Sequence, residues 1–341
     1  MNEENKNIAV SFWLLLITSL VGIMIVVGGL TRLTDSGLSI TRWDLISGIL
    51  PPLSLNEWEK SFSLYKKIPE FKILNSNMTL EQFKFIYYWE YSHRLLGRVI
   101  GIFYFFPLIY FTLKKTINKK FLLSLYSIFF LILLQGFVGW YMVQSGLIDR
   151  IDVSHYRLSL HLTLAFLLFI LLLWNYLEYN NNKNLTGNKK LPYFFPIILL
   201  TLITVQISIG AFVSGLDAGQ IYNSWPLMNG NYFPDDSSLK DLISLDSLNT
   251  PSIVQFIHRN VAYLILIFFL YIFIKVFNNN DFIYLRKIVL LIFLSLLVQI
   301  FLGILTVLYG AQILIASMHQ IGSIFLITSS LILVFKNSRI N

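Results

Sequence analysis

Long apolar stretches separated by polar segments dominate the pattern of this chain. Eight apolar runs are each close to the roughly 20 residues that a helix needs to cross a hydrocarbon core, and none reads as an alternating strand. The pattern therefore predicts an all-α polytopic membrane protein with eight transmembrane helices. The predicted spans are residues 11–33, 86–113, 121–143, 157–178, 193–214, 253–276, 288–309 and 313–335.

The polar segments also contain two longer regions, at about residues 34–80 and 215–250. Both are rich in Pro, Gly, Asn and Ser, which are typical of turns. In the first, the stretch NEWEKSFSLYKKIPEFKIL predicts a short amphipathic helix lying on the membrane surface. Thr79 and Gln82 have the spacing of a capping box, so the second span is expected to begin outside the lipid.

Composition agrees with the membrane assignment, since 56% of the 341 residues are hydrophobic and only 13% are charged. The formal net charge of +8 is unevenly distributed. With the N-terminus inside, 13 of the 26 Lys and Arg residues fall on the inner side with only four of the 18 acidic residues. This is the positive-inside pattern, which predicts that both termini are cytoplasmic and gives no indication of nucleic-acid binding.

The N-terminal residues MNEENKN contain two acidic residues, unlike an Arg-rich targeting peptide, and the first apolar run is too long for a cleaved signal. We therefore expect a bacterial inner membrane. The chain contains no cysteine. Disulfides, iron–sulfur clusters, thiolate ligands and covalent c-type heme attachment are excluded as a result.

The chain reads as two copies of one unit. At an offset of 182 residues the matches are Gly28/Gly210, Asp35/Asp217, Gly37/Gly219, Trp43/Trp225, Gly48/Gly230 and Pro52/Pro234. At offsets of 165, 164 and 158 the matches are His93/His258 with Arg94/Arg259, then Gln135/Gln299 with Gly139/Gly303, then His161/His319. Four spans per half is an even number, so the repeat is parallel. We predict two four-helix bundles, residues 1–180 and 181–341.

Four histidines lie just inside the outer ends of the even-numbered spans: His93, His161, His258 and His319. Titratable side chains at membrane depth usually mark a functional site. Two imidazoles facing each other across a helix bundle can hold a heme iron from both sides. The pairs His93/His161 and His258/His319 therefore predict two heme sites. The alternative is that each histidine only hydrogen-bonds a neighbouring helix. His155 has no repeat partner and is expected to be a solvated loop residue.

The surroundings of His93 suggest chemistry in the N-terminal half. Glu90 lies three residues before His93 on the same helical face. It is expected to act as a proton acceptor or as a stabiliser of positive charge. The second half has Gln255 at that position. An ion pair between Glu90 and Arg94 or Arg98 is the structural alternative. Arg94 and Arg98 lie where guanidinium groups could pair with heme propionates.

Other repeated positions have simpler interpretations. Asp35 and Asp217 are expected to form turns, and Trp43 and Trp225 to belong to the interfacial aromatic belt. Three Gln-Gly pairs spaced four residues apart are expected to let helices approach closely and hydrogen-bond across the interface. These pairs are Gln135/Gly139, Gln206/Gly210 and Gln299/Gly303.

Together these motifs resemble the heme A synthase family, in the type that lacks a cysteine pair in an outer loop. The resemblance covers essentially the whole chain. It is carried by GGLTRLTDSGLSITRW after the first span, EYSHRLLGR in the second, VSHYRLSLHL at the fourth, IHR in the sixth and MHQ in the eighth. His155 falls inside the fourth of these motifs.

The resemblance implies an oxidoreductase that converts the C8 methyl group of heme O to a formyl group by successive hydroxylations, with water as the oxygen source. It implies a heme b cofactor held by His258 and His319, with Arg259 beside it. It also implies a substrate heme held by His93 and His161, with Glu90 as the essential carboxylate. The product, heme A, would serve cytochrome oxidase. Implied partners are heme O synthase (protoheme farnesyltransferase) and cytochrome oxidase assembly factors.

Two other functional classes stay open at this point. A diheme b-type electron-transfer cytochrome would need two equivalent and permanently occupied sites, which the Glu90/Gln255 difference disfavours. A heme transporter or chaperone would fit the parallel repeat equally well. The sequence leaves the electron acceptor and a homo-oligomeric state open.

Overall fold

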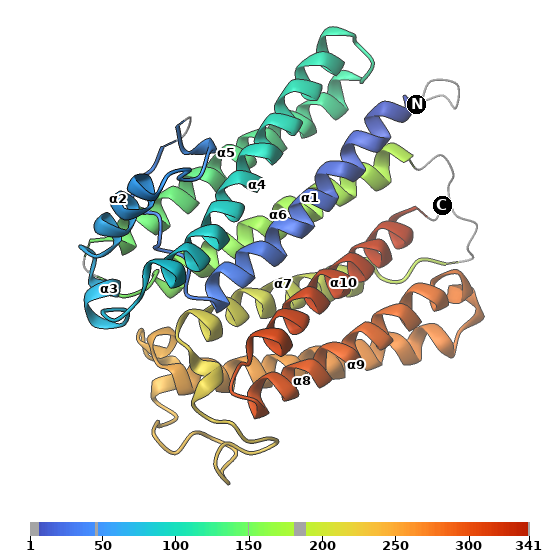
Figure 1. The fold of residues 1–341 in the computed structure, drawn as a ribbon. Helices are drawn as coiled ribbons and strands as arrows, with labels where there is room; N and C mark the ends of the chain where they lie inside the picture. The colour runs from blue at the N-terminus through green and yellow to red at the C-terminus, as the bar shows by residue number, and fades with distance from the viewer. Residues whose placement is uncertain (1–6, 45–46, 149, 181–188, 340–341) are drawn as a thin grey trace. The chain divides into compact units, whose positions relative to one another are not determined.

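A computed structural model describes residues 7–44, 47–148, 150–180 and 189–339. Within them the regular structure is helical, with one isolated β-bridge and no strand (Figure 1). Eight helices are long and apolar enough to cross a membrane, which confirms the predicted fold class. They are α1 (Ile8–Leu33), α4 (Leu80–Leu113), α5 (Lys119–Gly146), α6 (His155–Asn180), α7 (Phe194–Gly215), α8 (Pro251–Phe277), α9 (Arg286–Leu308) and α10 (Ile313–Ser338).

The predicted capping box is present and explains why α4 begins at Leu80, before the apolar run that marked it. The Thr79 hydroxyl accepts a hydrogen bond from the backbone N–H of Gln82, and the Gln82 side chain accepts one from the backbone N–H of Thr79. These bonds satisfy N–H groups that have no partner inside the helix. The polar first turns of α4 can therefore extend beyond the apolar span, as predicted.

The predicted surface helix is two helices, α2 (Leu55–Tyr65) and α3 (Pro69–Ile73). The chain is extended at Ile68, because the proline that follows disfavours the helical conformation there. The prediction that the apolar face lies on the membrane is wrong for the central residues of α2, because their side chains pack against α4. Trp58 is buried, and its ring centroid lies 5.0 Å from that of Tyr87 and 6.5 Å from that of Phe83, both on α4. The apolar face of α2 thus covers the outer end of α4.

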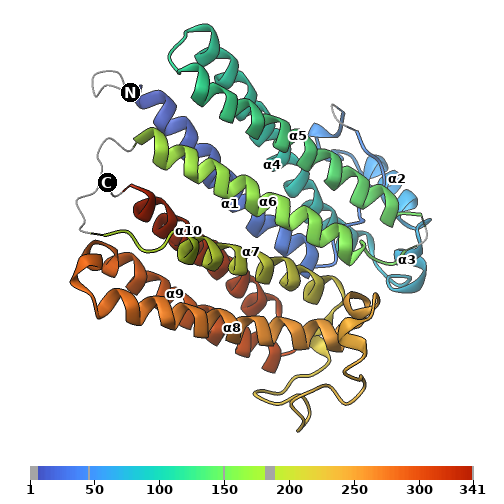
Figure 2. The ribbon, with the colours of Figure 1, turned by 180° about the vertical axis from the view of Figure 1, so that it is seen from behind.

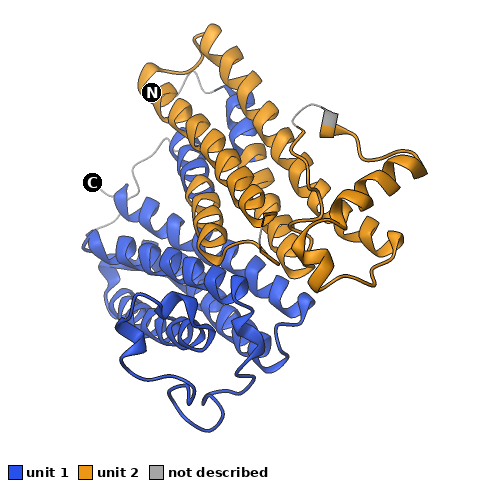
Figure 3. Cartoon of the chain, turned by 90° about the vertical axis from the view of Figure 1, so that its left-hand side faces the viewer, with its two compact units in different colours: residues 1–15, 169–341 blue, residues 16–168 orange. Residues whose placement is uncertain are grey.

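The division of the chain into compact units runs through two of the helices (Figure 3). Unit 2 is residues 16–168, and unit 1 is residues 1–15 with 169–341. The predicted boundary between residues 180 and 181 borders residues 181–188, which lie outside the described part, and it stays a prediction. The predicted orientation also stays a prediction, and some of the charged residues counted for it, in residues 1–6 and 181–188, lie outside the described part.

Within unit 1, α7 to α10 form a ring of neighbours in which each helix packs against the next and α10 returns to α7 (Figure 2). This is the four-helix arrangement predicted for the second half, and it places α8 and α10 diagonally across the bundle. Within unit 2, α4 packs against α5, and α2 packs against α4. The contacts described below add α1 and α6 to this group.

A carboxylate is buried in the outer cap of unit 2. Glu70 on α3 is 4% exposed, and its Oε1 accepts a hydrogen bond of 3.1 Å from the Tyr65 hydroxyl. Its Oε2 is buried without a hydrogen-bond partner among the described residues. Loss of hydration disfavours the charged form, so burial raises the pKa of Glu70 to about 8.

Glu70→Gln is expected to change how the stability of this cap depends on pH. In the unfolded chain Glu70 ionises near its ordinary pKa of about 4.3, whereas in the folded cap it holds its proton up to about pH 8. The unfolded state therefore binds fewer protons in this window, and the wild-type cap loses stability as pH rises through it.

Hydrogen exchange of residues 55–78 between pH 5 and 8, corrected for the intrinsic exchange rate, checks this prediction. The wild-type segment should lose protection with rising pH, and the Gln variant should lose less. Glu57→Gln, at an exposed capping residue, is the control. Parallel curves for wild type and Glu70→Gln would show that Glu70 is ionised in the folded protein throughout this range.

Candidate functional site

The four predicted histidines occupy one repeated environment, in which each ring lies against a glycine of a neighbouring helix. If a Cβ atom were placed on that glycine, it would lie 2.9 to 3.2 Å from the histidine Cε1 atom, closer than ordinary contact. Only glycine therefore leaves room for the imidazole. The pairs are His93 with Gly28, His161 with Gly139, His258 with Gly210 and His319 with Gly303.

The Nδ1 atom of each of these imidazoles is buried and has no hydrogen-bond partner among the described residues. Buried polar atoms are almost always paired, because leaving one unpaired costs free energy. The same situation at all four Nδ1 atoms indicates rings held for a group outside the protein, although His161 Nε2 also lies 3.4 Å from Gln135 Nε2. Imidazole is a common ligand of iron in such sites, so the residues present fit heme ligation.

His93 on α4 and His161 on α6 face each other within unit 2. Their ring centroids lie 6.4 Å apart, and the ring planes are inclined by 54°. A metal–imidazole nitrogen bond is about 2 Å long, and the ring centre lies roughly 1 Å beyond that nitrogen. Two rings that bind one iron from opposite sides should thus have centroids about 6 Å apart, which matches the observed distance.

In unit 1, His258 lies on α8 and His319 on α10, the two helices on one diagonal of the bundle. Their glycine contacts and buried Nδ1 atoms are those of the first pair. Because bundle sites form from side chains on facing helices, the second pair is suited to the same kind of ligation.

The predicted role of the Gln-Gly pairs is confirmed. In each pair the glutamine amide crosses to the neighbouring helix and donates to the backbone carbonyl of a histidine. The Nε2–O distances are 3.0 Å from Gln135 to His161, 2.9 Å from Gln206 to His258 and 2.9 Å from Gln299 to His319. The glycine one turn later provides the close approach.

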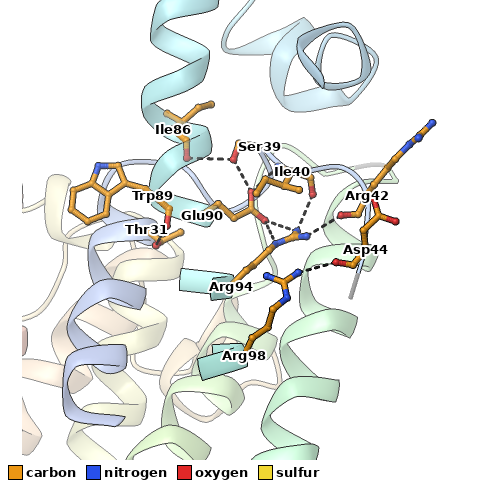
Figure 4. Close-up of polar contacts among 10 residues, drawn as sticks. All are labelled: Thr31, Ser39, Ile40, Arg42, Asp44, Ile86, Trp89, Glu90, Arg94 and Arg98. Carbon is orange, nitrogen blue, oxygen red and sulfur yellow. Dashed lines mark hydrogen bonds and ion pairs between the residues drawn. The ribbon is translucent and has the colours of Figure 1, made fainter. Parts of the chain in front are cut away.

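Glu90 is 3% exposed and forms four hydrogen bonds (Figure 4). Its Oε2 accepts from the Ser39 hydroxyl and from the backbone N–H of Ile40, both at 2.7 Å. Its Oε1 accepts from Arg94 Nε at 3.0 Å and from Arg94 Nη2 at 2.6 Å. The ion pair named as the structural alternative is therefore present, and it binds the segment after α1 to α4.

The second half contains the corresponding arrangement. Arg94 donates to the carbonyls of Ile40 and Arg42, and Arg259 donates to the carbonyls of Tyr222 and Ser224 at the positions matched by the 182-residue offset. Gln255 occupies the place of Glu90, accepting a bond from Arg259 and donating to the Ala218 carbonyl. In both halves an arginine thus binds the loop carbonyls and a neighbouring side chain on its own helix. That side chain is the acidic Glu90 in the first half and the neutral Gln255 in the second.

The predicted propionate-binding residues Arg94 and Arg98 both line a pocket in unit 2. Arg98 donates to the Asp44 carbonyl at 2.8 Å, and the Arg94 guanidinium lies over the Trp43 ring at 4.9 Å. The pocket wall also includes Arg42 and Lys60. Four basic residues therefore line it together with Asp44, although Arg94 and Arg98 both donate to backbone carbonyls.

Two minor predictions have different outcomes. Asp35 and Asp217 both adopt left-handed backbone conformations, with φ of 48° and 50°, which confirms them as turn formers. His155 was placed in a loop, but it is the first residue of α6, where its ring lies 4.5 Å from that of Tyr156. The turn before α6 is therefore shorter than predicted.

Sequence reasoning missed two features of the site. Gly28 on α1 makes the space for the His93 ring, whereas Gly97, which follows His93 on α4, lies against Met24. Ser39 is fully buried and binds Glu90, which nothing in its own sequence context indicates. The matched Gly28 and Gly210 were the available signal for the first feature.

Comparison with known proteins identifies similar chains. Residues 11–331 match the family described as cytochrome oxidase assembly protein. The chain is similar to the heme A synthase of Pelagibacter ubique (strain HTCC1062), with 50% identity over 99% of both chains. It is 45% identical to the heme A synthase of Rickettsia bellii (strain RML369-C), over 93% of this chain and 94% of the relative. The heme A synthase of Parvibaculum lavamentivorans is 45% identical over 76% and 75%.

The glycine contacts generate a direct test of the site. Gly139→Ala would place a Cβ atom 2.9 Å from His161 Cε1, so the imidazole should be displaced and its axial ligation weakened. Gly136→Ala, on the same helix, meets nothing within 4 Å and is the matched control. Heme content and the low-spin absorption spectrum of the purified variants measure the outcome. Equal heme occupancy in both variants would contradict the assigned position of the ring.

Proposed function

The chain belongs to the heme A synthase family, and we propose that it oxidises the C8 methyl group of heme O to a formyl group. Two successive hydroxylations through an alcohol, with water as the oxygen source, produce heme A for cytochrome oxidase. Overall, the methyl group and one water molecule yield the formyl group, four protons and four electrons. The proposed setting is a bacterial inner membrane with both termini cytoplasmic.

The facing imidazoles of His93 and His161 are the observation that carries this proposal. A centroid separation of 6.4 Å suits one iron between the two rings, and the same unit holds the buried carboxylate of Glu90. The substrate heme O is therefore assigned to His93 and His161. Arg94 and Arg98 border the adjoining pocket, where positive charge favours the propionate groups of the substrate.

The resident heme b is assigned to His258 and His319. Their buried Nδ1 atoms and their contacts with Gly210 and Gly303 fit the group. When bound there, heme b would supply single-electron acceptance from the substrate and transfer to an external acceptor. Arg259 borders this region but holds the carbonyls of Tyr222 and Ser224, so its role is to fix the loop above the histidine.

The hydrogen bonds of Glu90 support one of its two candidate roles. Four donors face the carboxylate, two of them from Arg94, and this arrangement is suited to an anion. Removing electrons from the methyl carbon develops positive charge on the substrate, which water then attacks. Glu90 is proposed to stabilise that charge as a fixed anion, while Gln255 in the other half carries no charge.

Extraction and chromatography of the hemes provide the first test. The wild-type protein, expressed with heme O synthase, should yield the alcohol or formyl product as well as heme b. His258→Ala should lose heme b, whereas His93→Ala should keep heme b and yield no product. If only heme b is recovered from the wild type, at two equivalents per chain, the diheme electron-transfer cytochrome is the better assignment. Unmodified heme O alone would favour the transporter.

Glu90→Gln tests the charge of this residue. Gln255 shows that a glutamine can accept the bond from the arginine, but an amide nitrogen cannot accept from the backbone N–H of Ile40 as Glu90 Oε2 does, so heme O binding by the variant is measured together with product formation. Product formation should fall about 100-fold, within the range measured when one electrostatic stabiliser is removed. Gln255→Glu is the matched control and should not raise turnover. Full conversion of heme O by Glu90→Gln would eliminate the proposed role.

A further inference from the structure

His93 lacks the glutamine amide donor that the other three histidines share. Gln135, Gln206 and Gln299 each donate to the carbonyl of the histidine that their helix contacts. The offset that matches Gly28 with Gly210 matches Met24 with Gln206. A thioether has no N–H group, so Met24 cannot make this bond to His93. Its methyl group lies instead against Gly97, 3.2 Å from the position that a Cβ would take there.

The geometry explains what the amide does for the other three histidines. The glutamine and the glycine are four residues apart and therefore share one helical face. The neighbouring helix thus contacts the histidine at two points. Its glutamine amide donates to the histidine backbone carbonyl, and its glycine lies against the imidazole ring. A carbonyl can only accept hydrogen bonds, so the group facing it must be the amide nitrogen.

The two proposed heme sites differ in how many of their histidines have both the glutamine and the glycine contact. Both His258 and His319 are held by a glutamine and a glycine, through Gln206 and Gln299. In unit 2, His161 is held by Gln135 and Gly139, whereas His93 has Gly28 and Met24. The first pair of ligands is therefore fixed on one side only, and the second pair is fixed on both sides.

We propose that Gln135, Gln206 and Gln299 are positioning residues that fix three histidines for iron ligation, and that Met24 makes His93 the ligand that releases the tetrapyrrole. This inference rests on the proposed function, in which the His93/His161 site takes in substrate and gives up product. The His258/His319 site keeps its heme throughout. A single side chain on α1 thereby distinguishes an exchangeable site from a permanent one.

Reciprocal substitution tests this inference. The full-length protein in detergent is loaded with iron protoporphyrin IX, and transfer to excess apomyoglobin is followed in the Soret band. Two phases are expected, of which His93→Ala removes the faster. Met24→Gln should slow the faster phase about threefold to twentyfold, which corresponds to the measured strength of interhelical hydrogen bonds in membrane proteins. Gln206→Met should accelerate the slower phase by a similar factor.

Matched controls separate positioning from packing. Met24→Leu adds no donor and should leave both phases unchanged. Gln206→Met should also shift the electron paramagnetic resonance g values of the ferric low-spin heme at the second site, because these values depend on the orientation of the axial rings. A change in thermal stability without this shift would indicate a packing role only and would overturn the inference.

The remaining outcomes are also decisive. Wild-type rates in both reciprocal variants, or equal slowing by Met24→Leu and Met24→Gln, would overturn the inference while leaving the proposed function intact. If Met24→Gln does not fold, the rates and spectrum of Gln206→Met decide the question. If His93→Ala changes neither phase, no exchangeable heme is held there, and the proposed function fails together with this inference.

Discussion

The close contact between each histidine ring and a glycine on the adjacent helix is the constraint on which the site depends. Helices in a bilayer gain little from the hydrophobic effect when they associate, so small residues and interhelical hydrogen bonds determine how they pack. Here the same contacts that join two helices also place a histidine that we propose to ligate iron. Helix packing and the proposed ligation are therefore one requirement, and it is met in the same way by Gly28, Gly139, Gly210 and Gly303.

The structure also shows where the two halves of the chain are alike and where they differ. Arg94 and Arg259 fasten the outer loops through equivalent carbonyls, and the four histidines have equivalent surroundings. Among the differences near the histidines are Glu90 against Gln255 and Met24 against Gln206. Each exchange alters charge or hydrogen bonding and leaves the helices in place.

Much of this fold could be read from the sequence because the bilayer limits the choices. A span of about 20 apolar residues has to be a helix, since its backbone polar groups need partners within the segment. The predicted spans accordingly lie within a few residues of the observed helices. The four histidines and the Gln-Gly pairs were also found, because a polar residue within lipid stands out.

The sequence could not show how the outer segments pack or which glycine faces which ring. The apolar face of α2 has the same pattern whether it meets lipid or α4, and only the tertiary structure buries Trp58 between Phe83 and Tyr87. Glycines are frequent in membrane helices, so the sequence alone did not show that Gly28 is the glycine in contact with His93. The ion pair of Glu90 was one of two interpretations until its neighbours from the loop were known.

Arg94 and Arg259 donate hydrogen bonds to backbone carbonyl oxygens, and this has an evolutionary consequence. Any residue can present a carbonyl, so selection for this anchorage does not constrain which side chains follow α1 and α7. Residues 39–42 read Ser-Ile-Thr-Arg and residues 221–224 read Ile-Tyr-Asn-Ser, with no identity between them. Divergence of these eight positions has been possible without loss of a common geometry. In the segments that follow α1 and α7 the identity between the halves consequently lies mainly in glycines, a turn-forming aspartate, a tryptophan and a proline.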